Sequence, residues 1–306
     1  MYFPYLRGRQ FELIALREYA LLHGVKNNII PIIEPVKSTF NSMKMALSKL
    51  VLGDVKFALI LNPQVGELKN SNIVADALKE ELSDLSKWIP AFVLNNNYKV
   101  VRDFISTNNY SNVMLICTDN TDSDNPYFDE LLPNAKYIVS KENRTLKRKL
   151  RGKDFVLLND NFKAQKRNSE YLTMPEEKFT EEHLFYKEDG YFGFSDYTTL
   201  VSDFIEGGAA PYAVAIHLTY KKANEEIWMK HFTSITNDDK SNIQGKFAEA
   251  AKKAVEFLNS NNIHYNAANE LRNYYNNGDY PGLGMVKKIS IKNHLELIND
   301  SLKTGG

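Results

Sequence analysis

Eight short apolar runs divide the N-terminal part of the chain, and each is followed by a polar residue. The runs are continuous rather than alternating, which is typical of strands covered on both faces, as in parallel sheets. They occupy residues 2–6, 29–33, 57–61, 90–94, 113–118, 136–139, 155–158 and 191–195. The pattern therefore predicts eight buried strands.

Helical patterns lie between many of these runs. The candidates span residues 11–22, 72–85, 97–105, 146–150 and 176–186. Alternation of strands and helices predicts parallel βαβ units. Eight units predict an α/β fold of the (β/α)8 TIM-barrel-like type. An open, doubly wound sheet is the alternative, because the pattern alone does not show closure.

The rhythm changes beyond Asp196. Residues 212–220 and 226–233 flank a turn near Ala223 and Asn224, which predicts a β-hairpin. Helical patterns follow over residues 241–258 and 265–275, and a last helix is expected from about residue 292. Residues 207–211, rich in Gly and Pro, are the expected hinge. We therefore divide the chain into barrel strands and helices over 1–206, and a β-hairpin and helical C-terminal part over 207–306, packed on the same core.

Composition adds limits. Lys plus Arg and Asp plus Glu number 38 each, so the formal net charge is zero and no global field attracts nucleic acid or an anionic membrane. No apolar run reaches the roughly 18 residues that cross a bilayer, and the N-terminus does not resemble a signal peptide. We expect a cytoplasmic protein with no membrane partner, and nucleic acid is a disfavoured partner. Cys117 is the only cysteine and follows an apolar run, which favours a buried core thiol over a nucleophile.

The functional face of a (β/α)8 barrel is the carboxyl end of its strands. The polar residues that follow the eight runs are Arg7, Glu34, Asn62, Asn95, Asp119, Ser140, Asp160 and Asp196. Carboxylates grouped at a barrel mouth can hold Mg²⁺ or act as bases, so Glu34, Asp160 and Asp196 are the candidate catalytic residues. The alternative is that Asp and Asn only turn the chain at strand ends. The sequence identifies no cofactor, although a divalent metal such as Mg²⁺ fits this hypothesis.

Several basic and polar residues are candidate substrate contacts. Arg7 offers a bidentate fork for phosphate or carboxylate, or pairs with Glu34 as a structural ion pair. Lys37 follows the second run, while Arg167 and Asn168 lie in the loop after the seventh, which often contributes to the phosphate site of barrels.

His217 and His231 lie on the two arms of the predicted hairpin, about opposite each other. As a pair they could contact substrate, bind a metal or transfer a proton, or they could be packing residues. The sequence contains no HExxH motif, phosphate-binding loop or nucleophile elbow.

Five segments together resemble the beta-protein family of bacteria and phages. They are YFPYLRGRQFELIALRE, DNFKAQKRNSEY, GYFGFSDYTTL, AVAIHLTY with IWMKHF, and GLGMVKKISIKNHLEL. The resemblance extends over nearly the whole chain. It implies no particular activity, and its implied association is with phage–host conflict.

Two hypotheses of function follow. The first is a hydrolase that acts on an anionic or phosphate-containing small molecule at the barrel mouth. The second is a non-catalytic, partner-binding subunit of a bacterial or phage defence-type complex, whose protein partner is encoded nearby.

Overall fold

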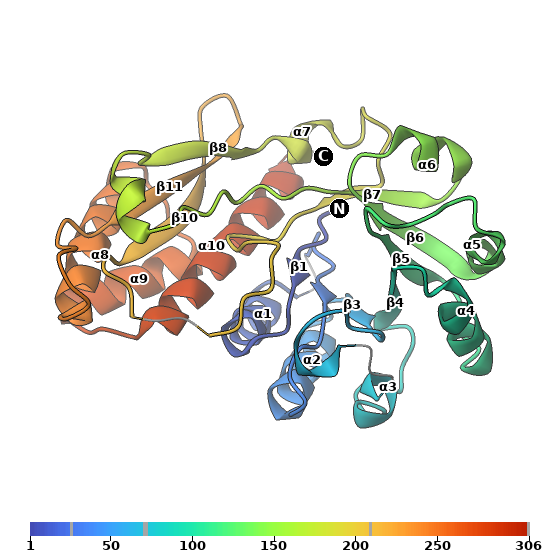
Figure 1. Cartoon of the computed structure of the whole chain (residues 1–306). Coiled ribbons are helices and arrows are strands. Elements are labelled where there is room, and N and C mark those ends of the chain that lie inside the picture. The colour runs from blue at the N-terminus through green and yellow to red at the C-terminus, as the bar shows by residue number, and fades with distance from the viewer. Residues whose placement is uncertain (25–26, 70–72, 208–209, 305–306) are drawn as a thin grey trace.

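Eight parallel strands form the wall of a barrel in the computed structural model, which describes residues 1–24, 27–69, 73–207 and 210–304 (Figure 1). The sheet follows chain order except that the eighth position is taken by β9. The strands are β1 Tyr5–Leu6, β2 Ile32–Ile33, β3 Phe57–Ile60, β4 Trp88–Leu94, β5 Val113–Cys117, β6 Ala135–Ser140, β7 Asp154–Leu158 and β9 Gly193–Ser195. All eight predicted runs contribute a strand, which confirms the predicted (β/α)8 barrel.

The first and last strands of the wall lie beside each other. The amide of Phe3 donates to the carbonyl of Phe194, and the amide of Tyr5 donates to the carbonyl of Asp196, both at 2.8 Å. Tyr2 and Phe194 form a parallel bridge at the same place. The sheet therefore returns on itself as a nearly closed barrel, and the open-sheet alternative is wrong.

Alternate residues of the strands fill the inside of the barrel. Ile32 of β2 and Met114 of β5 belong to the inner cluster, whereas their neighbours Ile33 and Leu115 face outward toward the helices. This alternation is the period-2 geometry of any strand. It decides which residues beyond each strand point into the mouth.

Helices cover the outside of the wall. They are α1 Gln10–His23, α2 Asn41–Leu52, α3 Val74–Ala77, α4 Tyr98–Thr107, α5 Pro126–Leu131 and α6 Arg144–Lys149. Asn side chains begin two of them: the Oδ1 of Asn125 accepts from the amide of Tyr127 at 3.0 Å, and that of Asn143 from the amide of Leu146 at 2.9 Å. Such caps satisfy amides that have no partner in the first turn.

Two predicted helices are wrong. Of the helix expected over 72–85, the structure has only α3, and Asn72 lies outside the described residues. Near the end of the expected helix, Asp84 accepts a hydrogen bond from the amide of Ser86 at 2.9 Å, which turns the chain. The helix expected over 176–186 is instead β8 Glu176–Thr180 followed by α7 Glu182–Phe185. Pairing of β8 with a strand far along the chain outweighs its local helical pattern.

A second unit lies beside the barrel (Figure 1). The predicted hairpin is confirmed as β10 Ala215–Lys221 and β11 Ile227–Thr233, and β8 pairs antiparallel with β11. Helices α8 Ile243–Ser260, α9 Asn266–Asn277 and α10 Leu283–Thr304 complete the unit. The last helix begins well before the predicted residue 292. The sheet of this unit therefore includes one strand, β8, from the part of the chain that we assigned to the barrel, residues 1–206. The predicted hinge at 207–211 includes residues 208 and 209, which lie outside the described residues.

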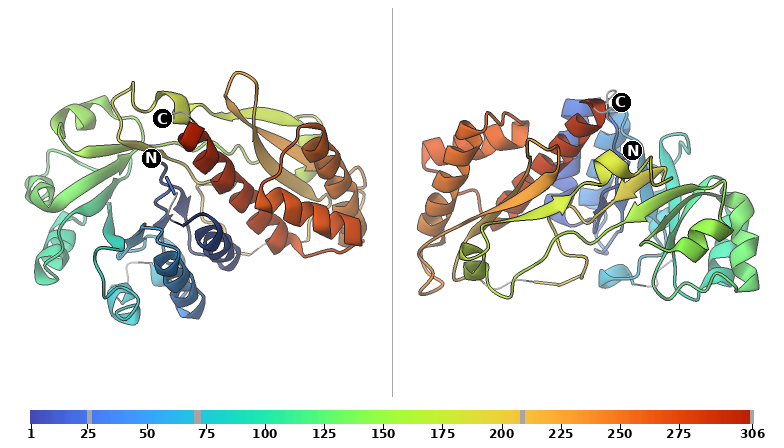
Figure 2. Two further views of the ribbon diagram at one scale, coloured as in Figure 1. Left: turned by 180° about the vertical axis from the view of Figure 1, so that it is seen from behind. Right: turned by 90° about the horizontal axis from the view of Figure 1, so that it is seen from above.

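Helix α10 joins the two units. It runs beside α1 in both views of Figure 2 and contacts the hairpin on its other side. Ile291 and Leu295 pack into the outer cluster of the barrel, whereas Val286 and Ile289 pack into the cluster of the hairpin and α8–α10. No helix in the described ranges is long and apolar enough to cross a membrane.

Candidate functional site

A pocket of about 260 Å³ opens at the carboxyl ends of the barrel strands. Counting in steps of two from the inward-facing strand residues selects the side chains that should point into it. Those that line the pocket are Arg7, Glu34, Asn95, Thr118, Lys141 and Tyr197. The structure therefore brings together Arg7 and Glu34, as predicted, and adds Lys141 and Tyr197, which were missed because they stand one position past the predicted residues Ser140 and Asp196.

Glu34 is the most buried polar residue of the mouth, with no exposed surface. One carboxylate oxygen, Oε2, accepts from the hydroxyl of Tyr5 at 2.8 Å and from Nη1 of Arg7. The other, Oε1, accepts from the amide of Gln64 at 2.7 Å. Both carboxylate oxygens of Glu34 therefore have hydrogen-bond partners. Of the two alternatives for Arg7, the structure shows the ion pair with Glu34. An engaged carboxylate of this kind positions its neighbours rather than attracting a proton from a substrate.

Arg7 lies between two tyrosine rings. Its guanidinium carbon is 5.0 Å from the ring centre of Tyr5 and 5.6 Å from that of Tyr197, and Nη2 donates to the carbonyl of Ser202 at 2.6 Å. Burial raises the pKa of Tyr197 to about 12, so its hydroxyl is a donor at neutral pH. The Nε of Arg7 is buried and has no hydrogen-bond partner among the described residues. Arg7 is therefore held rigidly, with a positive charge that is partly offset by Glu34.

Lys141 and Asp119 form the outer, adjustable part of the mouth. Their Nζ and Oδ2 atoms are 2.7 Å apart, and both side chains are mostly exposed. Exposed pairs of this type are weak and exchange readily with other ligands. Asp160 lies outside the lining of this pocket; it is exposed and accepts a hydrogen bond from the hydroxyl of Ser202, whose carbonyl contacts Arg7.

Asp196 does not share the pocket, contrary to the predicted carboxylate ring. Its Oδ1 accepts from the hydroxyl of Tyr2 at 2.6 Å and from the amide of Thr198 at 2.8 Å, and its Oδ2 is 3.6 Å from Nε2 of His294 on α10. The reason is the strand period: Phe194 faces the outer cluster, so residue 196 faces outward too, whereas Tyr197 packs against the inner cluster. Asp196 lies between barrel and α10.

Lys37 and Arg167 also lie apart from the mouth pocket. The Nζ of Lys37 is 2.8 Å from Glu67 and 3.6 Å from Glu206, and the side chain lines a different pocket beside the start of α1. Arg167 is exposed just before the short 3₁₀ helix Asn168–Leu172. The predicted anion contacts therefore do not converge on one place.

The two hairpin histidines meet as their spacing predicts. His217 and His231 are register partners, and their Nδ1 atoms are 2.8 Å apart. Burial lowers the pKa of His217 to about 3 and that of His231 to about 4, so both are neutral at physiological pH. Asn168, nearby, donates to the carbonyl of Ala213 at 2.8 Å. His217 and Asn168 line a second pocket, away from the barrel mouth, whereas His231 lies behind His217 and lines a different pocket.

The structure also bears on metals and on the thiol. Within the part of the chain that it describes, no group of three or more His, Cys, Asp or Glu side chains could hold a metal ion. Cys117 is buried, as predicted, and burial raises its pKa to about 12. It is therefore a protonated core thiol, which is a poor nucleophile.

Comparisons of this chain with protein-family models, with curated proteins and with solved structures found no match. A barrel fold does not by itself imply a function, which depends on the residues of the site.

Proposed function

We propose that this protein binds a small phosphate-containing or other anionic molecule at the barrel mouth and hydrolyses it. The observation that carries the proposal is that two cationic side chains, Arg7 and Lys141, line the same pocket. This pocket lies at the face where barrel enzymes bind their substrates. Asn95 and Thr118 add neutral polar groups to the same lining. The resemblance to the beta-protein family supplies only an association with phage–host conflict.

The proposed roles follow from how each side chain is held. Lys141 is free to turn from Asp119 to an incoming anion, because the pair is exposed. Arg7 is fixed and contributes charge rather than motion, while Glu34 and Tyr5 position it. Asp119, once released by Lys141, is the carboxylate best placed in the pocket to accept a proton from an attacking water. A Mg²⁺ ion brought by a phosphate substrate would find an oxygen ligand in the same carboxylate.

The first test measures the binding of inorganic phosphate to the whole chain by calorimetry or NMR. The matched variants are Lys141→Met and Lys136→Met, because Lys141 directly follows β6 and the exposed Lys136 lies near the other end of that strand. We expect about tenfold weaker phosphate binding for Lys141→Met, the loss of one charge-assisted hydrogen bond, and no change for Lys136→Met. Equal affinity in all three proteins would place anion binding elsewhere.

Hydrolysis is tested with phosphate monoesters and diesters that release a coloured alcohol. Asp119→Asn should retain phosphate binding and lose turnover. Binding without any turnover in the wild-type protein would favour the alternative, a non-catalytic subunit that binds a partner.

A further inference from the structure

A second pocket, of about 280 Å³, lies where the loop after β7, strand β10 and helix α10 meet. It shares no lining residue with the barrel mouth. Its walls are more apolar than polar, with Phe162, Leu200 and Val286 among the apolar residues, and its polar residues include Thr199 and His217. A concave, mostly apolar cavity with a few placed polar groups is the usual form of a small-molecule site.

His217 projects a fixed imidazole into this pocket. The rings of Phe162 and Tyr171 meet its ring edge-on, with centres 5.2 and 4.8 Å away. Its Nδ1 faces Nδ1 of His231, which leaves Nε2 on the opposite side of the ring. The orientation of His217 is therefore set by two aromatic contacts and one hydrogen bond.

His231 connects His217 to a carboxylate. Its side chain is fully buried, and its Nε2 is 3.5 Å from Oε1 of Glu177 on β8. Neither of these two atoms has a hydrogen-bond partner among the described residues, so each is the available partner of the other. Partial burial raises the pKa of Glu177, and Nζ of Lys163, 4.0 Å from its second oxygen, opposes that rise and favours the ionised carboxylate.

The series of contacts from Glu177 through His231 to His217 determines which ring nitrogens carry the protons. An ionised carboxylate only accepts, so the proton of His231 is on Nε2, facing Glu177. The Nδ1 of His231 is then an acceptor, and the hydrogen bond between the two rings requires a proton on Nδ1 of His217. The Nε2 of His217 is left as an acceptor with a free lone pair. Both rings are neutral, since burial keeps the pKa of each far below 7.

A second polar group in the lining lacks a partner. The hydroxyl of Thr199 is buried, the residue being 4% exposed, and it has no hydrogen-bond partner among the residues described. Buried hydroxyls without partners are costly, and a ligand would relieve that cost. Lys287 lies exposed at the rim and offers a positive charge.

We propose that this pocket is a second ligand site, which takes a small, largely aromatic or aliphatic hydroxy acid. The ligand hydroxyl donates to Nε2 of His217 and accepts from Thr199, the apolar body lies against Phe162 and Val286, and the carboxylate meets Lys287. Glu177 and His231 are positioning residues that hold His217 in the accepting tautomer. The site is independent of the function proposed for the barrel mouth.

The first test is ¹⁵N NMR of the imidazole rings in the whole wild-type chain. The expected spectrum has His217 protonated on Nδ1 and bare on Nε2, with His231 in the opposite tautomer. Glu177→Gln, whose amide oxygen still accepts, should retain this pattern, and Glu177→Leu should lose it. A proton on Nε2 of His217 in the wild type would overturn the assignment.

The second test compares two probes, 4-hydroxyphenylacetate and phenylacetate, which differ only in the hydroxyl. Titration should shift the His217 signals with the first probe, and the second should bind at least tenfold more weakly. His217→Phe should reduce the preference to less than twofold, while Lys141→Met at the barrel mouth should leave it unchanged. Equal affinity for the two probes, or no shift at His217 at millimolar probe, would overturn the proposal whether or not the mouth binds phosphate.

Discussion

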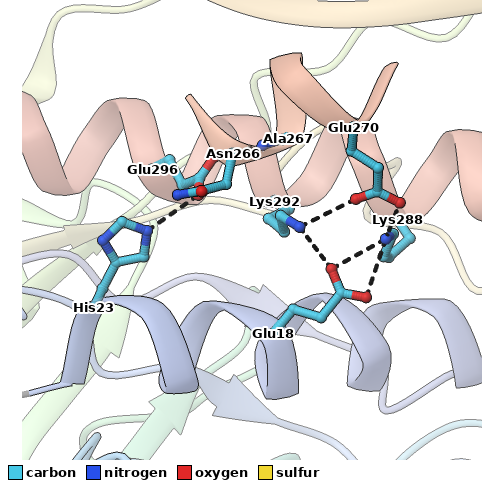
Figure 3. Close-up of polar contacts among 8 residues, drawn as sticks. All are labelled: Glu18, His23, Asn266, Ala267, Glu270, Lys288, Lys292 and Glu296. Carbon is cyan, nitrogen blue, oxygen red and sulfur yellow. Dashed lines mark hydrogen bonds and ion pairs between the residues drawn. The ribbon is translucent and has the colours of Figure 1, made fainter. Parts of the chain in front are cut away.

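Lys288 and Glu18 form an ion pair that joins the last helix of the chain to the first, with 3.0 Å between Nζ and Oε2 (Figure 3). Lys292, one turn further along α10, is 2.6 Å from the same oxygen, and Glu270 of α9 contacts both lysines. Both lysine side chains are almost fully buried. Four charges therefore close the junction between α1, α9 and α10, and each lysine has two carboxylates.

Lys292→Met is expected to destabilise the protein because it leaves Glu18 and Glu270 with one lysine between them. Removing one partner of a buried ion pair costs about 3–5 kcal/mol, and here the remaining lysine and the partial exposure of Glu18 reduce the loss to about 1–3 kcal/mol. Urea unfolding measures it. Lys303→Met, an exposed change near the end of the same helix, should alter the free energy of unfolding by less than about 0.5 kcal/mol. Equal effects of the two changes would contradict the importance of the network.

The same network should make stability depend on pH at both extremes. Burial raises the pKa of Glu18, but hydrogen bonds from Lys292 and Lys288 outweigh that effect, and the net pKa lies below the ordinary value of 4.5. A lowered carboxyl pKa gives stability that is present above 4.5 and is lost as pH falls through the folded-state value.

Lys292 behaves in the opposite sense. Burial lowers the pKa of Lys292, but the hydrogen bonds and charges of Glu18 and Glu270 raise it by more, so the net pKa lies above 10.5. The contribution of Lys292 to stability is therefore present below pH 10.5 and is lost as the pH rises through the folded-state pKa. Unfolding free energies measured across pH should therefore fall at both ends. In Lys292→Met the acid-side fall should be shallower; an unchanged acid limb would show that Glu18 is not coupled to Lys292.

Gly284 permits the close approach of α10 to α1. A Cβ at this position would overlap the ring of Phe11. Gly284→Ala is therefore expected to cost about 1–3 kcal/mol through overpacking, measured as a lower melting temperature. Combining it with Phe11→Leu should recover part of the loss, because the smaller side chain vacates the space. A double variant as unstable as the sum of the two single changes would contradict the contact.

Glu34→Gln distinguishes a positioning carboxylate from a catalytic base. The change preserves shape but leaves Arg7, mostly buried, without its counter-charge, so a loss of about 3 kcal/mol in the free energy of unfolding is expected. Arg7→Met in the same background should recover much of it, since the uncompensated charge is then absent. A stable but inactive Glu34→Gln protein would instead support the base role that the sequence first indicated for Glu34.

The sequence predicted the barrel because burial on both faces leaves a continuous apolar run in every strand. It predicted Arg7 and Glu34 in the mouth because both stand at an inward position after short strands. Asp196 was misplaced by a single residue, since strand ends are uncertain by about that much and one step reverses the side of the wall. Glu177 was not foreseen, because it lies in a segment that reads as a helix and becomes β8 only by pairing with β11.

Diffraction from crystals soaked in tungstate, a heavy analogue of phosphate, tests the central claim most directly. The account predicts an anomalous peak in the barrel mouth within hydrogen-bond distance of Nζ of Lys141, and its loss in Lys141→Met crystals but not in Lys136→Met crystals. Peaks confined to surface lysines outside the pocket, with the Lys141–Asp119 pair intact, would contradict the claim that the mouth is an anion site.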